Sequence, residues 1–237
     1  MLRITNAAKT FTLHVQHGAK VEAFSGVSFE IQAGSALALS GRSGSGKSSL
    51  LRMIYGNYAS APGTIAIYHR ANWVDMGLAD ARLVRDMRCL TVGYISQFLR
   101  VVPRVPAIDV VAEPLIARGK TKAAARDRAA TLLTRLRIRE ELWALSPVTF
   151  SGGEQQRVNV ARGFAAFYPL MLLDEPTASL DAANSDTVAG LIEEAKERGA
   201  AIAGIFHDAA MRTRLATHIY EMPGRAPANG GDPQTEA

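Results

Sequence analysis

The order of apolar and polar positions divides the chain into short strands and longer helices. Residues 2–11 and 23–31 alternate between the two classes, which predicts two antiparallel strands joined by turn residues. The same pattern predicts further strands at 35–40, 64–68, 90–96, 170–173 and 200–206, and helices at about 47–58, 123–136, 152–167 and 182–197. Because strands alternate with helices, we expect an α/β fold.

The middle of the chain has a different character. Prolines at 103, 106 and 114 precede a helical pattern of Ala and Leu, so residues 98–150 are expected to form an inserted helical subdomain. We expect one domain over residues 1–222. Residues 223–237 are rich in Pro, Gly and Ala, which predicts a disordered tail.

Composition and charge bear on where the protein is located and what it binds. The chain lacks an apolar run of about 18 residues and begins without the apolar stretch of a signal peptide, which predicts no membrane span. Cys89 is the single cysteine, so no disulfide can form within the chain, and a cytoplasmic location is expected. The net charge is +5, but the basic residues are spread along the chain, so we expect no nucleic-acid partner.

Residues 41–48, Gly-Arg-Ser-Gly-Ser-Gly-Lys-Ser, fit the phosphate-binding pattern G-x-x-x-x-G-K-[ST] between a strand and a helix. Backbone N–H groups of such a loop and the N-terminus of the helix bind phosphate oxygens. Lys47 is expected to reach the outer phosphates of ATP, and the Ser48 hydroxyl to ligate Mg²⁺. The remaining expected nucleotide contacts here are Gly41, Ser43, Gly44, Gly46 and Ser49.

The apolar strand 170–173 ends in two acidic residues. A strand buried on both faces in a parallel sheet requires such an apolar run. Asp174 is expected to lie at Mg²⁺, and Glu175 to polarise the water that attacks the γ-phosphate. A solvated Asp-Glu pair at a strand end is the simpler explanation, but the preceding phosphate loop favours catalysis.

A second glycine-rich helix start follows the insert. Ser151, Gly152 and Gly153 open a helix whose free N–H groups suit a γ-phosphate. Because this motif lies far from the first loop in sequence, it is expected to serve the ATP of another subunit.

With these motifs in this order, the chain resembles the nucleotide-binding domain of ABC ATPases. The resemblance implies a P-loop NTPase core of ABC type, with an antiparallel β subdomain and the helical insert, that works as a dimer with two ATP sites. It also assigns Gln97 to Mg²⁺ and the γ-phosphate, Asp181 to the dimer interface at the nucleotide, and His207 to the γ-phosphate. Phe11 could stack on adenine, although a core phenylalanine is nearly as plausible. Phe150 and Glu154 depart from the Leu and Gln that are common in transporters.

Finer stretches resemble the L proteins of the bacterial carbon–phosphorus lyase system: residues 72–75, 91–104, 149–164 and 204–208. That resemblance implies a role in forming ribose 1-phosphonate triphosphate, with soluble lyase core subunits and a second ABC subunit, itself or a sister protein, as partners. The alternatives are a motor for a membrane ABC transporter and a regulatory ATP switch with negligible turnover.

Overall fold

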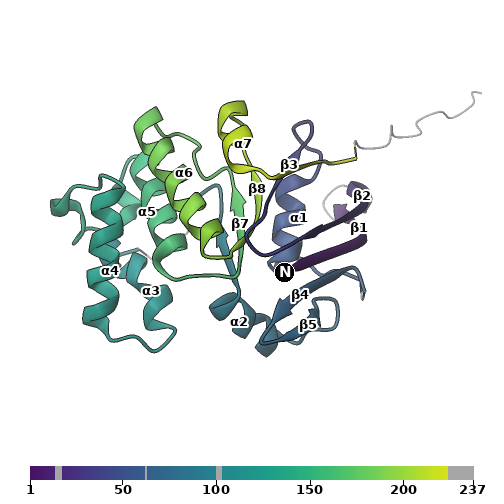
Figure 1. Cartoon of the computed structure of the whole chain (residues 1–237), viewed down its shortest axis with the longest axis horizontal. Coiled ribbons are helices and arrows are strands. Elements are labelled where there is room, and N and C mark those ends of the chain that lie inside the picture. The colour runs from purple at the N-terminus through teal and green to yellow at the C-terminus, as the bar shows by residue number, and fades with distance from the viewer. Residues whose placement is uncertain (14–17, 62, 100–102, 224–237) are drawn as a thin grey trace, which may run out of the picture.

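The computed structural model describes residues 1–13, 18–61, 63–99 and 103–223, and it has the predicted α/β architecture. An antiparallel sheet, a parallel sheet and a group of helices follow one another along the long axis of the molecule (Figure 1). The predicted tail, 223–237, lies outside the described residues except for Pro223.

The antiparallel sheet has the strand order β2-β1-β4-β5. It consists of β1 (Leu2–Leu13), β2 (Ala19–Ile31), β4 (Ile65–His69) and β5 (Asn72–Asp75). Leu2 pairs with Ile31 on one side and with Ile67 on the other, so apolar residues of three strands face the same core. The predicted antiparallel pairing of the first two strands is confirmed.

The parallel sheet has the order β6-β7-β8-β3-β9. Its strands are β3 (Ala36–Ser40), β6 (Val92–Ile95), β7 (Leu170–Asp174), β8 (Ala201–Ile205) and β9 (His218–Glu221). Since neighbouring strands run in the same direction, their carboxyl ends share one edge, where ligands bind in open α/β sheets. The predicted phosphate loop and the acidic pair both begin at this edge.

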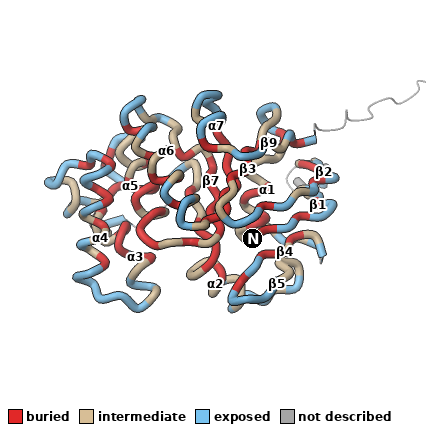
Figure 2. The backbone as a smooth tube through the Cα atoms, in the orientation of Figure 1, coloured by how far each residue is buried: buried red, intermediate tan, exposed pale blue. Residues whose placement is uncertain are grey.

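Alternate residues of the parallel sheet enter two separate cores. In β7, Leu170 and Leu172 pack towards the antiparallel sheet and α1 (Lys47–Ile54), whereas Met171 and Leu173 pack towards the helices on the other face. Figure 2 shows the buried backbone concentrated in these central strands. This two-sided burial explains why the strand is apolar at every position.

Helices cover the sheet on the side away from the antiparallel strands (Figure 1). The predicted helices at 123–136, 152–167 and 182–197 are α4 (Lys122–Arg135), α5 (Gly152–Ala165) and α6 (Ala182–Glu197). The sequence pattern missed α2 (Ala81–Leu90), α3 (Ala107–Ile116), α7 (Ala209–Leu215) and strand β9. In α3, Pro114 lies in the last turn, where it supplies no backbone N–H, and the helix ends two residues later at Ile116.

The inserted region forms the helical layer on the left of Figure 1. It contains α3, α4 and two short 3₁₀ helices, Glu140–Leu142 and Pro147–Thr149, and it packs against α5. Within the described residues, no helix has the length and apolar character that crossing a membrane requires.

Candidate ATP site

The backbone of the phosphate loop adopts conformations that only glycine accommodates easily. Gly44 and Gly46 have φ angles of 78° and 85°. A Cβ on Gly46 would lie 2.6 Å from the carbonyl oxygen of Ala23 and 2.7 Å from the Phe24 ring. The glycine therefore meets both a backbone requirement and a packing requirement. Lys47 Nζ donates to the carbonyls of Gly41 and Arg42 at 2.7 and 2.9 Å, which holds the ammonium over the loop.

The helix that follows this loop begins without a side-chain cap. No side chain bonds to the N-terminus of α1, and its first turn has no acidic residue. By contrast, α2, α4, α5, α6 and α7 each begin at a side chain that accepts a backbone N–H. Free N–H groups and the positive end of the helix dipole suit an anion here, so the loop fits the phosphates of ATP. Ser43 is exposed in the loop, and Ser49 lies half-buried in α1.

Asp174, at the end of β7, is fully buried and held by two hydroxyl groups. Ser48 Oγ donates to Oδ1 at 2.8 Å, and Tyr94 Oη donates to Oδ2 at 3.0 Å. Burial raises the pKa of Tyr94, and the charge of Asp174 raises it further, so this phenol keeps its proton. Hard oxygen ligands beside a phosphate loop suit Mg²⁺, and Ser48 and Asp174 supply them.

Glu175 lies between the two other predicted catalytic residues. His207 Nε2 lies 2.7 Å from Glu175 Oε1, and Gln97 Nε2 donates to Oε2 at 3.3 Å. The three side chains come from the ends of β7, β8 and β6, three neighbouring strands. The fold thus brings Gln97, Glu175 and His207 together next to Asp174.

The backbone of Glu175 is strained. Its φ angle is 55°, in the left-handed region that a non-glycine residue rarely adopts. Its N–H donates to Ile205 O at 3.2 Å, and Gln156 Nε2 from α5 donates to Pro176 O at 3.1 Å. Such strain is tolerated where surrounding contacts fix the backbone, which is common at catalytic sites.

The second glycine motif forms the predicted helix start. Ser151 caps α5 in a capping box: Ser151 N and Oγ both donate to Glu154 Oε2, at 3.0 and 2.7 Å, and Ser151 Oγ accepts from Glu154 N at 3.4 Å. The hydrogen bonds from Ser151 lower the pKa of Glu154. A carboxylate therefore already binds the Ser151 groups that are expected to bind a γ-phosphate.

The other predicted contacts lie away from the phosphate loop. In the described part of the chain, no hydrogen bond joins Ser151, Gly152 or Gly153 to residues 41–48. Asp181 caps α6 by accepting from Asn184 N at 2.7 Å. A Cβ on Gly153 would lie 3.1 Å from Ser179 O, so the start of α5 lies close to the loop that precedes α6.

Phe11 packs against an aromatic residue that follows the C-terminal end of α1. Its ring centroid lies 5.2 Å from that of Tyr58, which follows α1, and 5.7 Å from Lys9 Nζ. The ring is half-buried on β1. These contacts fit either an adenine-stacking residue or a packing residue, so the assignment stays a prediction.

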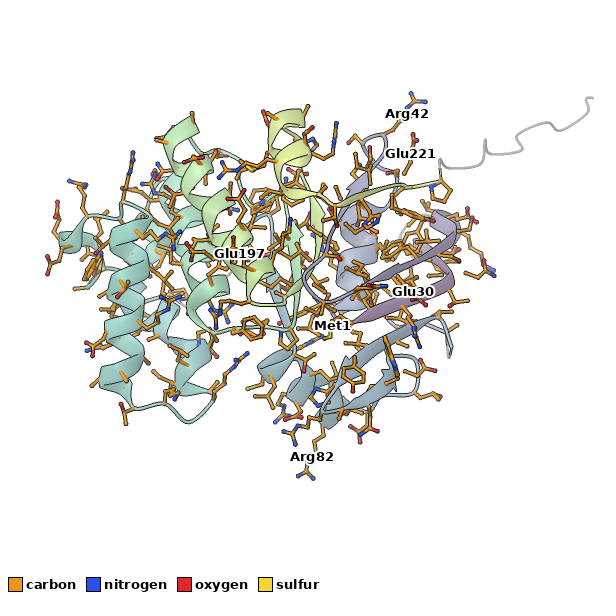
Figure 3. All side chains as sticks on the ribbon, viewed as in Figure 1. Met1, Glu30, Arg42, Arg82, Glu197 and Glu221 are labelled. Carbon is orange, nitrogen blue, oxygen red and sulfur yellow. The ribbon has the colours of Figure 1, made fainter. Side chains whose placement is uncertain are left out.

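Arg42 marks the exposed end of the phosphate loop in Figure 3, where it lies at the same end of the molecule as Glu221. This placement follows from the sheet, since Ser40 pairs with Glu221. Sequence patterns had not identified Tyr94, Gln156 or the pairing of Glu154 with Ser151 as parts of the site. Tyr94 belongs to no recognised motif. It lies two residues before Ser96 and three before Gln97, so its place in the chain was the one signal that it lies near the site.

Two adjoining hollows lie beside this site. One, of about 390 Å³, lies between α2, α3 and α5, and the other, of about 420 Å³, extends to Gln97 and Phe98. Both are lined by Tyr55, Tyr94 and Arg162, so together they form one groove, called the tyrosine groove below. Its described lining contains four arginines, Arg52, Arg85, Arg88 and Arg162, but one acidic residue, Glu113.

Comparisons with known proteins agree with this geometry. The family model described as "ABC transporter" matches residues 24–178. The lipoprotein-releasing system ATP-binding protein LolD of Shewanella denitrificans is 34% identical over 84% of this chain and 83% of that protein. The methionine import ATP-binding protein MetN of Cereibacter sphaeroides is 33% identical over 93% of this chain and 62% of that protein.

Two solved structures of one cassette share the fold. The dimeric structure of MJ0796, a bacterial ABC transporter cassette, has a TM-score of 0.84 and 26% identity over 94% of both chains. Its dimeric post-hydrolysis state, bound to ADP and Pi, has a TM-score of 0.82 and 26% identity over 94% of both chains.

Proposed function

Because the chain belongs to the ABC transporter family of ATPases, we propose that it is the ATP-hydrolysing subunit of a larger machine and works as a dimer of ABC subunits. The observation that carries this proposal is the placement of Glu175 between His207 and Gln97, beside Asp174 and the phosphate loop. A base, two polar γ-phosphate contacts and a phosphate cradle are the parts that ATP hydrolysis needs.

The phosphate loop binds and orients the nucleotide. Its N–H groups and the uncapped α1 receive the phosphates, and Lys47 leaves the carbonyls of Gly41 and Arg42 to pair with the outer ones. Ser48, Asp174 and Gln97 would hold Mg²⁺, which neutralises charge on the β- and γ-phosphates when it is bound. Asp174 is already oriented for this role by its two hydroxyl partners.

Glu175 then acts on water. Its carboxylate accepts a proton from the attacking water, while His207 and Gln97, which bond to its two oxygens, hold it in place. In the proposed complex with ATP, the same two side chains would contact the γ-phosphate. General base catalysis of this kind typically contributes a factor of about 10² to 10⁴ to the rate.

A second ABC subunit completes each site. Ser151, Gly152 and Gly153 bind the γ-phosphate on the partner's loop, and the turn with Asp181 lies beside them at the interface. The lack of hydrogen bonds between this motif and residues 41–48 within the described chain supports action across a dimer. The dimeric arrangement of the MJ0796 cassette supports it as well.

The first candidate for the machine is a membrane transporter. LolD and MetN, by their names, serve lipoprotein release and methionine import, and MJ0796 is a transporter cassette. In that role, the chain would act together with membrane-spanning subunits. These relatives make the transporter motor the better supported candidate.

The second candidate is the carbon–phosphorus lyase system. The observation that favours it is the resemblance of residues 91–104 and 149–164 to the L proteins of that system. In this role, ATP hydrolysis would drive a soluble lyase core during formation of ribose 1-phosphonate triphosphate. None of the relatives described above belongs to that system, so this candidate rests on those stretches alone.

In either machine, the tyrosine groove is the proposed docking surface. It reaches Gln97, so a docked segment would contact the ATP site directly. Arg88 bonds to neutral acceptors, Tyr55 O and Asn57 Oδ1, and it has no carboxylate partner within the described chain. The excess of arginine favours a partner segment with acidic side chains.

The test is purification of the tagged chain from its native cells grown with limiting phosphate, followed by mass spectrometry. An integral membrane permease in the eluate supports the transporter, and soluble lyase subunits support the second candidate. Arg85→Glu, which reverses a charge in the groove, should weaken binding of either partner while it keeps ATP binding. If the purified chain neither binds nor hydrolyses ATP, the proposed ATPase function itself is wrong.

A further inference from the structure

Tyr94 connects the tyrosine groove to a proposed magnesium ligand. Its hydroxyl donates to Asp174 Oδ2 at 3.0 Å, while its ring lines both hollows of the groove. Asp174 is fully buried, and its other oxygen accepts from Ser48 at 2.8 Å. One side chain therefore touches both the carboxylate and the surface on which a partner is proposed to dock.

The contacts continue from Tyr94 to the wall of the groove. Its ring lies 5.1 Å from the ring of Tyr55 at an interplanar angle of 42°. The Arg88 guanidinium stacks 4.5 Å from the centre of the Tyr55 ring, and Arg88 Nε donates to Tyr55 O at 2.9 Å. These three residues form a continuous packed row from an arginine in the groove to Asp174.

Packing alone does not require the hydroxyl of Tyr94. A phenylalanine ring would fill the same space against Tyr55, but it would leave Asp174 Oδ2 without this donor. A buried carboxylate needs hydrogen bonds to remain charged and fixed in orientation.

We propose that Tyr94 is a positioning residue that fixes Asp174 for Mg²⁺, and that a partner segment in the tyrosine groove acts on the ATP site through Arg88, Tyr55 and Tyr94. This inference rests on the proposed ATPase function. It gives a second route by which a docked segment changes the metal site; the first is direct contact of that segment with Gln97. No chemical step passes through Tyr94 itself.

The test compares Tyr94→Phe with Tyr220→Phe. The control loses a hydroxyl that accepts from Ser28 N at 3.2 Å and keeps its ring against Phe29. Binding of a fluorescent ATP analogue is titrated with Mg²⁺ and repeated without metal. Because a hydrogen bond to a charged group is lost, Tyr94→Phe should raise the half-saturating Mg²⁺ concentration about tenfold and leave metal-free binding unchanged.

The second variant, Arg88→Met, tests the route to the groove. It removes the cation over Tyr55 and keeps a long side chain, so we expect a rise of about threefold in the half-saturating Mg²⁺ concentration. The proposal is overturned if Tyr94→Phe behaves like Tyr220→Phe, or if metal-free binding falls by the same factor as metal-dependent binding. An unchanged Mg²⁺ dependence in Arg88→Met overturns the route through the groove. If the wild-type chain binds no nucleotide, the proposed function fails first.

Discussion

Gln97 and His207 bond to opposite oxygens of the Glu175 carboxylate, the histidine at 2.7 Å and the glutamine at 3.3 Å. The two residues come from strands on either side of β7, so the position of the carboxylate depends on three strands of one sheet. Any residue at 175 that keeps the shape but lacks the negative charge should keep the arrangement and lose the base.

Glu175→Gln should therefore reduce steady-state ATP turnover by about 10²- to 10⁴-fold and leave ATP affinity close to that of the wild type. Because hydrolysis no longer reopens the subunits, Mg·ATP should trap a dimer, measured by size-exclusion chromatography with light scattering. The matched control is Glu193→Gln, because Glu193 lies on α6 and pairs with Arg214. Unchanged turnover in Glu175→Gln would exclude Glu175 as the base.

Gly46→Ala should destabilise the protein and abolish ATP binding. The alanine would have to adopt a φ of 85°, and its Cβ would lie 2.6 Å from Ala23 O, so both backbone strain and a steric clash destabilise the variant. Gly119→Ala is the control, since its φ is 82° but nothing lies within 4 Å of the new Cβ. The left-handed conformation alone costs about 1–2 kcal/mol, so urea unfolding should show a larger loss for Gly46→Ala than for Gly119→Ala. Equal losses would mean that packing against Ala23 is unimportant.

The sequence predicted those parts of the fold whose local pattern matches their burial. Strand β7 is apolar at each position because both of its faces are buried, and the loop 41–48 carries a motif that requires its own backbone shape. Helix α2 was missed because its arginines, including Arg82 and Arg85, outnumber its single fully buried residue, Met87. Helix α3 lies in the proline-containing stretch before the predicted helix, and it packs against α4 and α5, contacts that no local pattern records.

The same distinction holds for the site. Glu175 was expected from the acidic end of an apolar strand, whereas Gln97 and His207 were assigned by the resemblance to ABC ATPases. The structure brings the three together because each follows a strand of one parallel sheet, and strand ends meet at one edge. Tyr94 was not predicted as part of the site, since its side chain on β6 reaches Asp174 on the neighbouring strand β7, a contact that no spacing in the sequence records. The role of Glu154 also depends on a rotamer, which brings its carboxylate back to Ser151.

Lys47→Ala should weaken ATP binding by about 10- to 100-fold, because a charge-assisted contact to phosphate is lost. Among the described residues, the Lys47 ammonium bonds only to carbonyl oxygens of its own loop, so the variant should keep nearly wild-type stability. Isothermal titration calorimetry measures the affinity, and Arg42→Ala is the control in the same loop. A comparable loss in Arg42→Ala would mean that general positive charge, rather than the position of Lys47, binds the phosphates.

Glu154→Gln should promote ATP-dependent dimerisation. The Glu154 carboxylate binds Ser151 N and Oγ, so it would compete with a γ-phosphate bound there and repel it. Glutamine preserves the capping box but removes the charge, and the ATP concentration for half-maximal dimerisation should fall about threefold at low salt. The difference should shrink as ionic strength rises. Light scattering across an ATP titration measures it, and an unchanged or weaker dimer in Glu154→Gln would contradict the competition.

Acid should loosen the helical insert through Asp109. Arg126 bonds to both oxygens of Asp109, at 2.6 and 2.7 Å, and joins α4 to α3. These hydrogen bonds, reinforced by the charge of Arg126, lower the pKa of Asp109 below its ordinary value. A carboxyl group with a lowered folded-state pKa stabilises the protein above its unfolded pKa of about 3.9, and this stabilisation is lost as pH falls through the folded pKa.

Asp109→Asn should therefore lower the urea midpoint at pH 7, and its difference from the wild type should shrink as pH falls below about 3.9 towards the lowered pKa of Asp109, where that carboxyl group takes up its proton. Because Arg126 is partly exposed, the effect at pH 7 should be modest and should weaken in high salt. Asp127→Asn, one position away from Arg126 on an exposed face of α4, is the control. Equal midpoints for Asp109→Asn and the wild type at pH 7 would show that the pair contributes nothing to the docking of α3 on α4.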